Sequence, residues 1–219
     1  MRSRILCVLL VLMTLGTFSG FSIAYLQQET IQEQSLRIAE LMEPEIPIVY
    51  DTPAERDMPT YIQSDPEWGE ETYSTGNLTT HGCGLTAFAM GLEYLTGIHM
   101  TPSSLHALVG DSCLDGGQND IGKFIDFAES NGYPVHGSDQ LWYLGDSLAM
   151  LRKGGVLFGA MSGPLGDEYY GGHIVLMYSA NDEGVIVMDP ASEVNSNKRY
   201  SYEEIYSIDW SYFYYLEEV

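Results

Sequence analysis

Residues 82–95 read GCGLTAFAMGLEYL and join the sharpest local feature of the sequence, a cysteine between two glycines, to a helical pattern. After the cysteine, apolar side chains recur at the intervals that place them on one face of a helix. The pattern predicts a helix from Cys83 to Leu95 that is buried along this face, and Gly97 is expected to stop it. The apolar face consists of Leu85, Phe88, Ala89, Leu92 and Leu95.

More helices are predicted downstream of this one. Thr101 can cap a helix with its hydroxyl group, and Pro102 fits the first helical turn. Ser201 and Glu204 have the spacing of a capping box, in which two side chains satisfy the first N–H groups of a helix. Helices are therefore expected over residues 102–109, 120–130 and 147–152, with a short one after Ser201.

The second half of the chain is predicted to be mostly sheet. Residues 181–184, Asn-Asp-Glu-Gly, have the composition of a hairpin turn. The glycine-rich stretch 163–172 is expected to be a flexible exposed loop, and whether it lines a substrate groove stays open. Strands are expected over residues 133–136, 156–161, 173–179, 185–189 and 210–216. Helices first and strands afterwards indicate an α+β domain, with a helical lobe followed by an antiparallel sheet lobe.

The N-terminal 24 residues have the features of an export signal. Arg2 and Arg4 precede an apolar run, and small residues lead to a plausible cleavage point after Ala24. A retained membrane anchor is the alternative interpretation. Residues 25–59 read as a polar helical spacer and a proline-rich linker, which leaves residues 60–219 as the folded domain. We therefore expect a secreted or cell-surface protein, and whether the spacer acts as a propeptide stays open.

The charge of the chain is strongly acidic. It has 9 Lys+Arg against 31 Asp+Glu, a formal net charge of −22. Such a surface repels phosphate backbones, so a nucleic-acid partner is not expected. The charge could attract cationic substrates or metal ions, or simply keep an exported protein soluble by self-repulsion.

Cys83 is the candidate nucleophile. The start of a helix presents unpaired N–H groups and partial positive charge, which favour the thiolate. Gly82 and Gly84 flank it and would let a substrate backbone approach closely. From local context alone, an inert cysteine or one half of a disulfide with Cys113 is equally plausible.

His173 is the candidate base, since it opens an apolar predicted strand after two glycines. His81, close to Cys83 in sequence, is a weaker candidate. Asp189 ends the strand that pairs with the His173 strand by a hairpin, near enough to orient the imidazole. Gln63 is a candidate side-chain donor to an oxyanion. Each of these residues also has a plain alternative. His173 could be a structural histidine, Asp189 could simply start an Asp-Pro turn, and Gln63 could be an ordinary surface glutamine.

Several motifs occur together in a fixed order. They are Tyr61-Ile62-Gln63-Ser64-Asp65 with Trp68, His81-Gly82-Cys83-Gly84-Leu85-Thr86-Ala87 with Met90, Tyr94-Leu95-Thr96-Gly97 before Thr101-Pro102, Gly172-His173-Ile174-Val175, and Asp189-Pro190. Over residues 60–216 the chain resembles the papain-like cysteine peptidases of the C39 type, in particular their stand-alone C39-like branch.

The resemblance implies an exported bacterial thiol hydrolase of peptide or related amide bonds. Cys83 would be the nucleophile, His173 the base, Asp189 the group that orients the imidazole, and Gln63 the oxyanion-hole donor. No metal or organic cofactor is implied. We expect a monomer acting on a peptide, a protein or a cell-wall peptide, with a membrane tether if the N-terminal segment is retained.

Two other functions remain open. The domain could be a catalytically silent cell-surface binding module, or an acyltransferase with transglutaminase-like chemistry. The bacteriocin-exporting C39 peptidases are attached to a transporter, whereas the stand-alone branch is poorly defined in substrate. The resemblance therefore does not supply a substrate.

Overall fold

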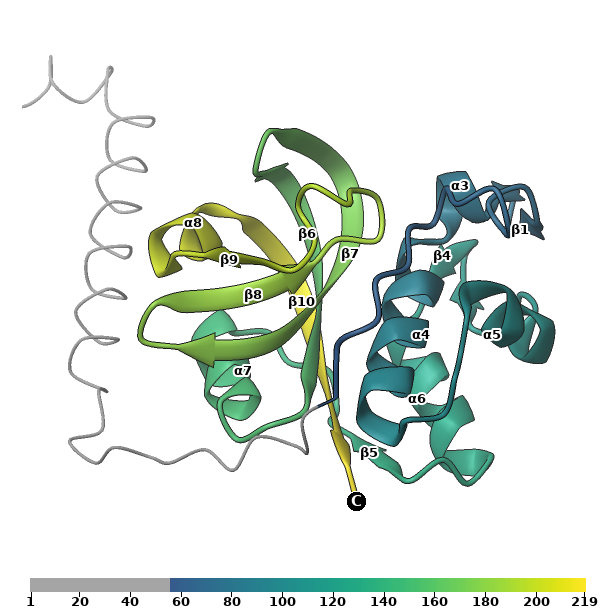
Figure 1. Ribbon diagram of the computed structural model, residues 1–219, viewed down its shortest axis with the longest axis horizontal. Coiled ribbons are helices and arrows are strands. Elements are labelled where there is room, and N and C mark those ends of the chain that lie inside the picture. The colour runs from purple at the N-terminus through teal and green to yellow at the C-terminus, as the bar shows by residue number, and fades with distance from the viewer. Residues whose placement is uncertain (1–55) are drawn as a thin grey trace, which may run out of the picture. The chain divides into compact units, whose positions relative to one another are not determined.

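The computed structural model describes residues 56–219, which lie in a unit spanning Val49–Val219 (Figure 1). The expected signal or anchor (residues 1–24) and all but the last residues of the expected spacer (residues 25–59) lie outside the described residues. Those expectations, and export with them, stay predictions. Among residues 56–219, no helix has both the length and the apolar character needed to cross a bilayer.

The helices follow the capping signals closely. They are α3 (Leu78–His81), α4 (Cys83–Thr96), α5 (Pro102–Val109), α6 (Ile121–Ser130), α7 (Leu144–Leu151) and α8 (Tyr202–Ser207). Gly97 ends α4 with a left-handed φ of 69°, and Thr101 caps α5 by accepting the Ser104 N–H. Helix α7 starts at Leu144, before the predicted Ser147. Its N-cap residue, Tyr143, makes no side-chain hydrogen bond to the helix, so the sequence contains no capping signal for this start.

One six-stranded antiparallel sheet forms the second half of the domain. Its strands are β5 (Val135–Gly137), β6 (Val156–Leu165), β7 (Glu168–Asn181), β8 (Gly184–Met188), β9 (Lys198–Tyr200) and β10 (Asp209–Glu218). Their order is β5-β10-β6-β7-β8-β9, so the last strand of the chain lies inside the sheet. Two short hairpins, β1 (Thr72–Tyr73) with β2 (Gly76–Asn77) and β3 (Leu114–Asp115) with β4 (Gln118–Asn119), were not predicted.

The sheet has an apolar core on each face. On one face, α4, α5 and α6 pack through a cluster in which Phe88 stacks on Phe124 at 5.2 Å and on Phe158 at 5.4 Å between ring centroids. On the other face, α7 and α8 cover a second cluster through Leu148, Leu151 and Ile205 (Figure 1). This arrangement confirms the predicted α+β class.

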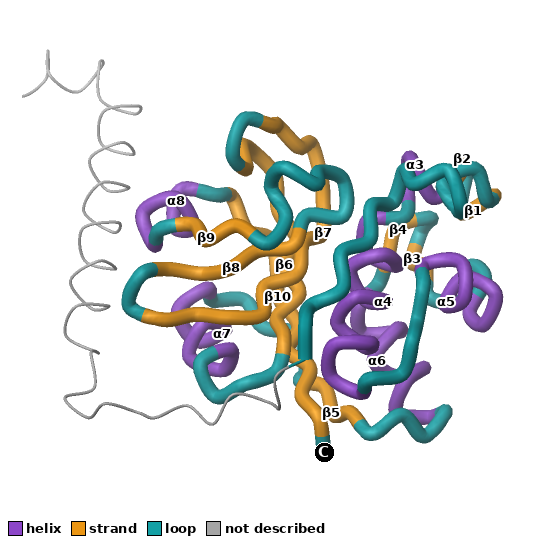
Figure 2. The backbone as a smooth tube through the Cα atoms, viewed as in Figure 1, coloured by secondary structure: helices purple, strands orange, loops and turns teal. Residues whose placement is uncertain are grey.

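The glycine-rich stretch 163–172 is not a loop, contrary to our expectation. It continues β6 and β7 into a hairpin in which Gly163 faces Tyr170 and Leu165 faces Glu168 (Figure 2). The turn uses Gly166 with a φ of 59°, a conformation that favours glycine. Glycines diluted the apolar alternation that signals a strand, so composition was misleading here. His173 consequently lies inside β7 and does not open it.

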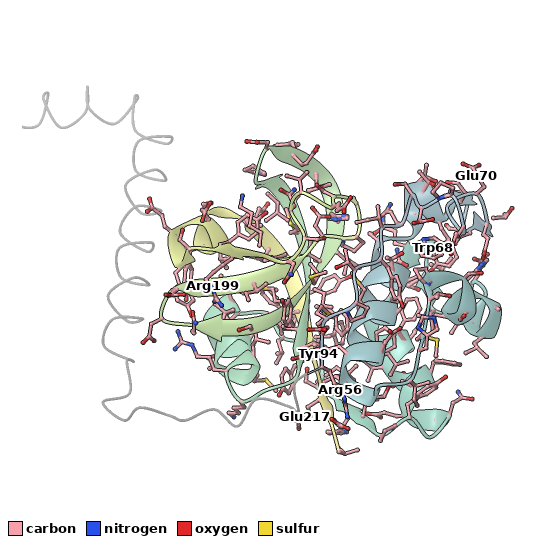
Figure 3. All side chains as sticks on the ribbon, viewed as in Figure 1. Arg56, Trp68, Glu70, Tyr94, Arg199 and Glu217 are labelled. Carbon is pink, nitrogen blue, oxygen red and sulfur yellow. The ribbon has the colours of Figure 1, made fainter. Side chains whose placement is uncertain are left out.

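The first described residues are tied to both halves of the domain. Arg56 donates to the carbonyl groups of Tyr94 and Leu95 at the end of α4, and to the Glu218 carboxylate at the end of β10. Figure 3 shows Arg56 beside Tyr94. Further on, the Tyr61 N–H lies 3.4 Å from the sulfur of Met90, also in α4. Contacts therefore begin slightly before the predicted domain start at residue 60.

Candidate active site

Cys83 is the first residue of α4, as predicted. Gly82 ends α3 and also serves as the N-cap of α4, so the two helices follow each other directly. The backbone N–H groups of Gly84, in the first turn of α4, and of Ile174, in β7, both lower the pKa of the Cys83 thiol. These donors come from the helix and from the sheet, so the sulfur lies where the two meet.

The two glycines beside Cys83 have a different cause from the one expected. A Cβ at Gly84 would lie 2.4 Å from the Cβ of Asn119, and one at Gly82 would lie 2.5 Å from the Leu78 carbonyl oxygen. Both positions are filled by the protein itself. Glycine is therefore required there for packing.

His173 lies beside Cys83, and hydrogen bonding between the two side chains lowers the pKa of the thiol and raises that of the imidazole. The imidazole Nε2 donates to Asp189 Oδ1 at 2.8 Å, so its other nitrogen, Nδ1, is the one left for the thiol. Burial by itself would lower the pKa of His173. The hydrogen bonds with Asp189 and Cys83 outweigh burial and raise that pKa to about 9.

The hydrogen bonding between His173 and Cys83 also shifts the pKa of the thiol. Burial alone would raise the pKa of Cys83, but the His173 imidazole and the two backbone donors hold it below its ordinary value. A lowered thiol pKa and a raised imidazole pKa favour a thiolate–imidazolium pair. The electrostatics of the site therefore favour the thiolate form of Cys83.

Asp189 is fully buried and surrounded by hydrogen-bond donors. Its Oδ1 accepts from His173 and from the Ala191 N–H at 2.9 Å. Its Oδ2 accepts from the Tyr170 hydroxyl at 2.7 Å and from Asn195 Nδ2 at 3.2 Å. Burial would raise the pKa of Asp189, but these donors, with His173 the strongest, lower it overall. The carboxylate is held ionised and in one orientation.

Tyr170 contacts both His173 and Asp189, whereas the sequence analysis placed it in an exposed loop beside the histidine and did not predict these contacts. Its ring stacks on the His173 imidazole with centroids 4.2 Å apart and an interplanar angle of 16°. The residue lies on β7 in the stretch that we expected to be a loop. Tyr170 and His173 are three residues apart, and two such side chains on a regular strand point to opposite faces of the sheet. The pairing of β6 with β7 has a register shift just after Met161, and this local distortion allows the two rings to meet. That shift could not be read from the sequence.

Gln63 reaches the segment just before Cys83. Its backbone N–H donates to the Pro190 carbonyl at 2.7 Å, next to Asp189, and its Nε2 donates to the Thr79 carbonyl in α3 at 2.6 Å. The side chain is buried, and its Oε1 has no hydrogen-bond partner. A primary amide carries two N–H donors, and the Thr79 carbonyl uses one of them.

Asn119 is a second residue of the site that the sequence analysis missed. Its Nδ2 lies 3.9 Å from the Cys83 sulfur and donates to the His81 carbonyl at 2.7 Å. A lone asparagine before a helix cap, as here before Asp120, is a common turn signal. The β3–β4 hairpin that brings it to the helix start had no detectable strand pattern.

The two described cysteines are both free. Cys113 is buried among the residues on the helical side of the sheet, and burial raises its thiol pKa. The disulfide between Cys83 and Cys113, left open by the sequence, is therefore not formed. The described residues also contain no group of three or more His, Cys, Asp or Glu side chains placed to hold a metal ion.

A family model described as "Papain-like cysteine protease AvrRpt2" matches residues 70–206, which include Cys83, His173 and Asp189. None of the curated proteins compared with the chain matches it.

Three solved structures are similar to the chain. A putative C39-like peptidase from Bacillus anthracis has 17% identity and a TM-score of 0.47, covering 73% of this chain and 94% of its own. A double-glycine-motif protease from an AMS/PCAT transporter, in complex with the leader peptide, has 12% identity and a TM-score of 0.48, with coverage of 74% and 93%. The peptidase domain of Streptococcus ComA, an ABC transporter, has 13% identity and a TM-score of 0.46, with coverage of 64% and 93%.

The family model spans more than half of the 219 residues, and the predicted papain-like relationship is confirmed. The chain belongs to the family of papain-like cysteine proteases represented by AvrRpt2.

Proposed function

We propose that this protein hydrolyses peptide or related amide bonds, with Cys83 as nucleophile, His173 as acid and base, and Asp189 as the group that orients the imidazole. The observation that carries the proposal is the continuous hydrogen-bonded chain from the Cys83 sulfur through the His173 ring to the buried Asp189 carboxylate. A structural cysteine needs no such chain, whereas a thiolate nucleophile does.

The chemistry follows from the two pKa shifts. The Cys83 thiolate attacks the carbonyl carbon, and the electron pair of the carbonyl bond moves to its oxygen. When the tetrahedral intermediate collapses, the His173 imidazolium gives its proton to the leaving amine, which departs and leaves a thioester on Cys83. A water molecule, deprotonated by the now neutral imidazole, then hydrolyses the thioester.

The developing oxyanion needs donors that are already in place. The backbone N–H of Cys83 belongs to the first turn of α4, where N–H groups lack partners within the helix. The second N–H of the Gln63 amide is the other donor that we propose. Its first N–H anchors the side chain to Thr79, in the turn before Cys83.

Two alternatives use the same fold. A silent binding module would not need the free, low-pKa thiol that the site contains. An acyltransferase would form the same thioester and differ only in the acceptor, so product analysis with added amines distinguishes it from a hydrolase. We propose peptides as the substrate class. Action outside the cytoplasm is a further proposal, which depends on the export signal expected in residues 1–24.

The proposed function predicts a bell-shaped pH dependence of peptide turnover. Below the lowered pKa of Cys83 the thiol is protonated and cannot attack. Above the raised pKa of His173, about 9, the ring loses the proton that the leaving amine requires. We therefore expect kcat/KM to fall on the alkaline side near pH 9.

The test is digestion of a mixed peptide library by the protein over this pH range, with products read by mass spectrometry. Pretreatment with iodoacetamide should abolish cleavage. Cleavage that persists after complete alkylation of Cys83, or that keeps rising well above pH 9, would contradict the proposed roles.

Asp189→Asn is expected to lower kcat by about 10²–10⁴-fold. From the sequence alone this change could be mild, because an amide can also orient an imidazole. In the structure, however, each of the two carboxylate oxygens accepts hydrogen bonds from two donors. An amide NH₂ group placed there would face another donor and would disturb either the imidazole or the Tyr170 hydroxyl.

Steady-state kinetics of the Asp189→Asn protein measure this effect. The control is Asp209→Asn, because Asp209 is exposed and accepts only a 3.4 Å bond from Ser162. Near-normal kcat in a folded Asp189→Asn protein would show that the carboxylate has no role in orienting the ring.

A further inference from the structure

Asn119 occupies an unusual position at the start of α4. It is the last residue of β4, in a hairpin whose turn contains Gly116 and Gly117, with φ values of 55° and 84°. The next residue, Asp120, donates its N–H to the Cys113 carbonyl at 3.0 Å and closes the loop. The hairpin thus presents the Asn119 side chain to the helix start from a fixed base.

The Asn119 amide bonds on both sides of the nucleophile. Its Oδ1 accepts the Leu85 N–H at 3.2 Å and the Tyr73 hydroxyl at 2.8 Å. Its Nδ2 donates to the His81 carbonyl at 2.7 Å and lies 3.9 Å from the Cys83 sulfur. Residues on either side of Cys83 are therefore fixed by one side chain, and the amide N–H end faces the sulfur.

The packing shows that this contact is built into the fold. Gly84 must lack a side chain because Asn119 fills the space where its Cβ would be. Tyr73 is fully buried, and its hydroxyl group donates to the oxygen of the Asn119 amide. A donor on the oxygen increases the partial positive charge on the nitrogen of the same amide. The nitrogen lies 3.9 Å from the Cys83 sulfur, within reach of an N–H···S hydrogen bond.

We propose that Asn119 is a positioning residue for the nucleophile: it fixes residues 81–85 around Cys83 and stabilises the thiolate with its amide N–H. This inference rests on the proposed function of Cys83 and adds a donor that is separate from His173, Gln63 and the backbone N–H groups. The Tyr73 hydroxyl supports it through the amide oxygen.

Two substitutions separate stabilisation of the thiolate from simple anchoring. Asn119→Asp keeps the shape and the oxygen that accepts from Leu85 and Tyr73, but it replaces the N–H donor by a negative oxygen. Asn119→Ala removes the anchor and the donor without adding charge. If Asn119 only anchors residues 81–85, the thiol pKa of Asn119→Asp should be closer to wild type than that of Asn119→Ala. If its N–H acts directly on the sulfur, the thiol pKa of Asn119→Asp should be further from wild type.

The measurement is the rate of Cys83 alkylation by iodoacetamide as a function of pH, followed by intact mass, with folding checked by circular dichroism. We expect the apparent thiol pKa to increase from wild type to Asn119→Ala and again to Asn119→Asp. A shift of about one unit corresponds to roughly tenfold slower alkylation at low pH. Tyr73→Phe should give a smaller shift in the same direction.

A thiol pKa unchanged in folded Asn119→Ala, or lower in Asn119→Asp than in Asn119→Ala, would overturn the inference. If Asn119→Ala does not fold, the Asn119→Asp and Tyr73→Phe proteins decide, and an unchanged pKa in both overturns it. Alkylation does not require turnover. A wild-type protein that cleaves no peptide, but whose thiol pKa responds to residue 119, would refute the proposed hydrolase and leave this inference standing.

Discussion

Cys83→Ala is expected to abolish peptide turnover, with a loss of at least about 10⁴-fold in kcat. Without the sulfur no thioester can form, and the remaining groups of the site can only bind and polarise the substrate. The helix should persist, because Gly82 and the backbone bonds that start α4 do not depend on the thiol. Library digestion and residual kcat measure the effect, and thermal unfolding reports whether the fold is intact.

Cys113→Ala is the matched control for this experiment. Cys113 is also a free cysteine, but it is buried in the helical-side core with a raised thiol pKa. Its removal should lower stability by about 1 kcal/mol through the small cavity it leaves, and turnover should stay near wild type. Cleavage retained by Cys83→Ala, or lost equally in both variants, would contradict the assignment of Cys83.

The helices could be predicted from the sequence because their signals are local. Thr101 and Asp120 cap α5 and α6 with their side chains, and Ser201 and Glu204 form both bonds of the capping box at α8. Each of these signals needs only a few consecutive residues. Cys83, His173 and Asp189 have equally local signals in the sequence, which are a helix start, a strand and a hairpin.

The features that were missed depend on long-range pairing. Strand β10 is inserted between β5 and β6, and no local pattern specifies a neighbour in a sheet. Asn119 and Tyr170 reach the site through a short hairpin and a register shift, respectively. The packing that requires the two glycines next to Cys83 is also long-range or tertiary in part, since a Cβ at Gly84 would meet Asn119 and one at Gly82 would meet the Leu78 carbonyl.

His173→Ala is expected to lower both peptide turnover and the reactivity of the Cys83 thiol, which are measured separately. Turnover should fall by at least about 10³-fold, because neither attack nor departure of the amine has a proton carrier. The thiol should also lose its strongest source of activation, since the imidazole hydrogen bond is the largest effect that lowers the pKa of Cys83. Burial would then dominate and raise that pKa, so that alkylation by iodoacetamide near neutral pH becomes slow.

The control for this substitution is His81→Ala. His81 is closer to Cys83 in sequence, but its ring bonds only to the hydroxyl groups of Thr80 and Thr75. Its carbonyl, which anchors Asn119, is kept in the alanine variant. In His81→Ala we expect Cys83 to be alkylated by iodoacetamide, and substrate to be turned over, at close to wild-type rates. If His173→Ala remains folded and its Cys83 still reacts at the wild-type rate, the imidazole does not activate the sulfur. The hydrogen-bonded chain on which the hydrolase proposal depends would then have no chemical consequence.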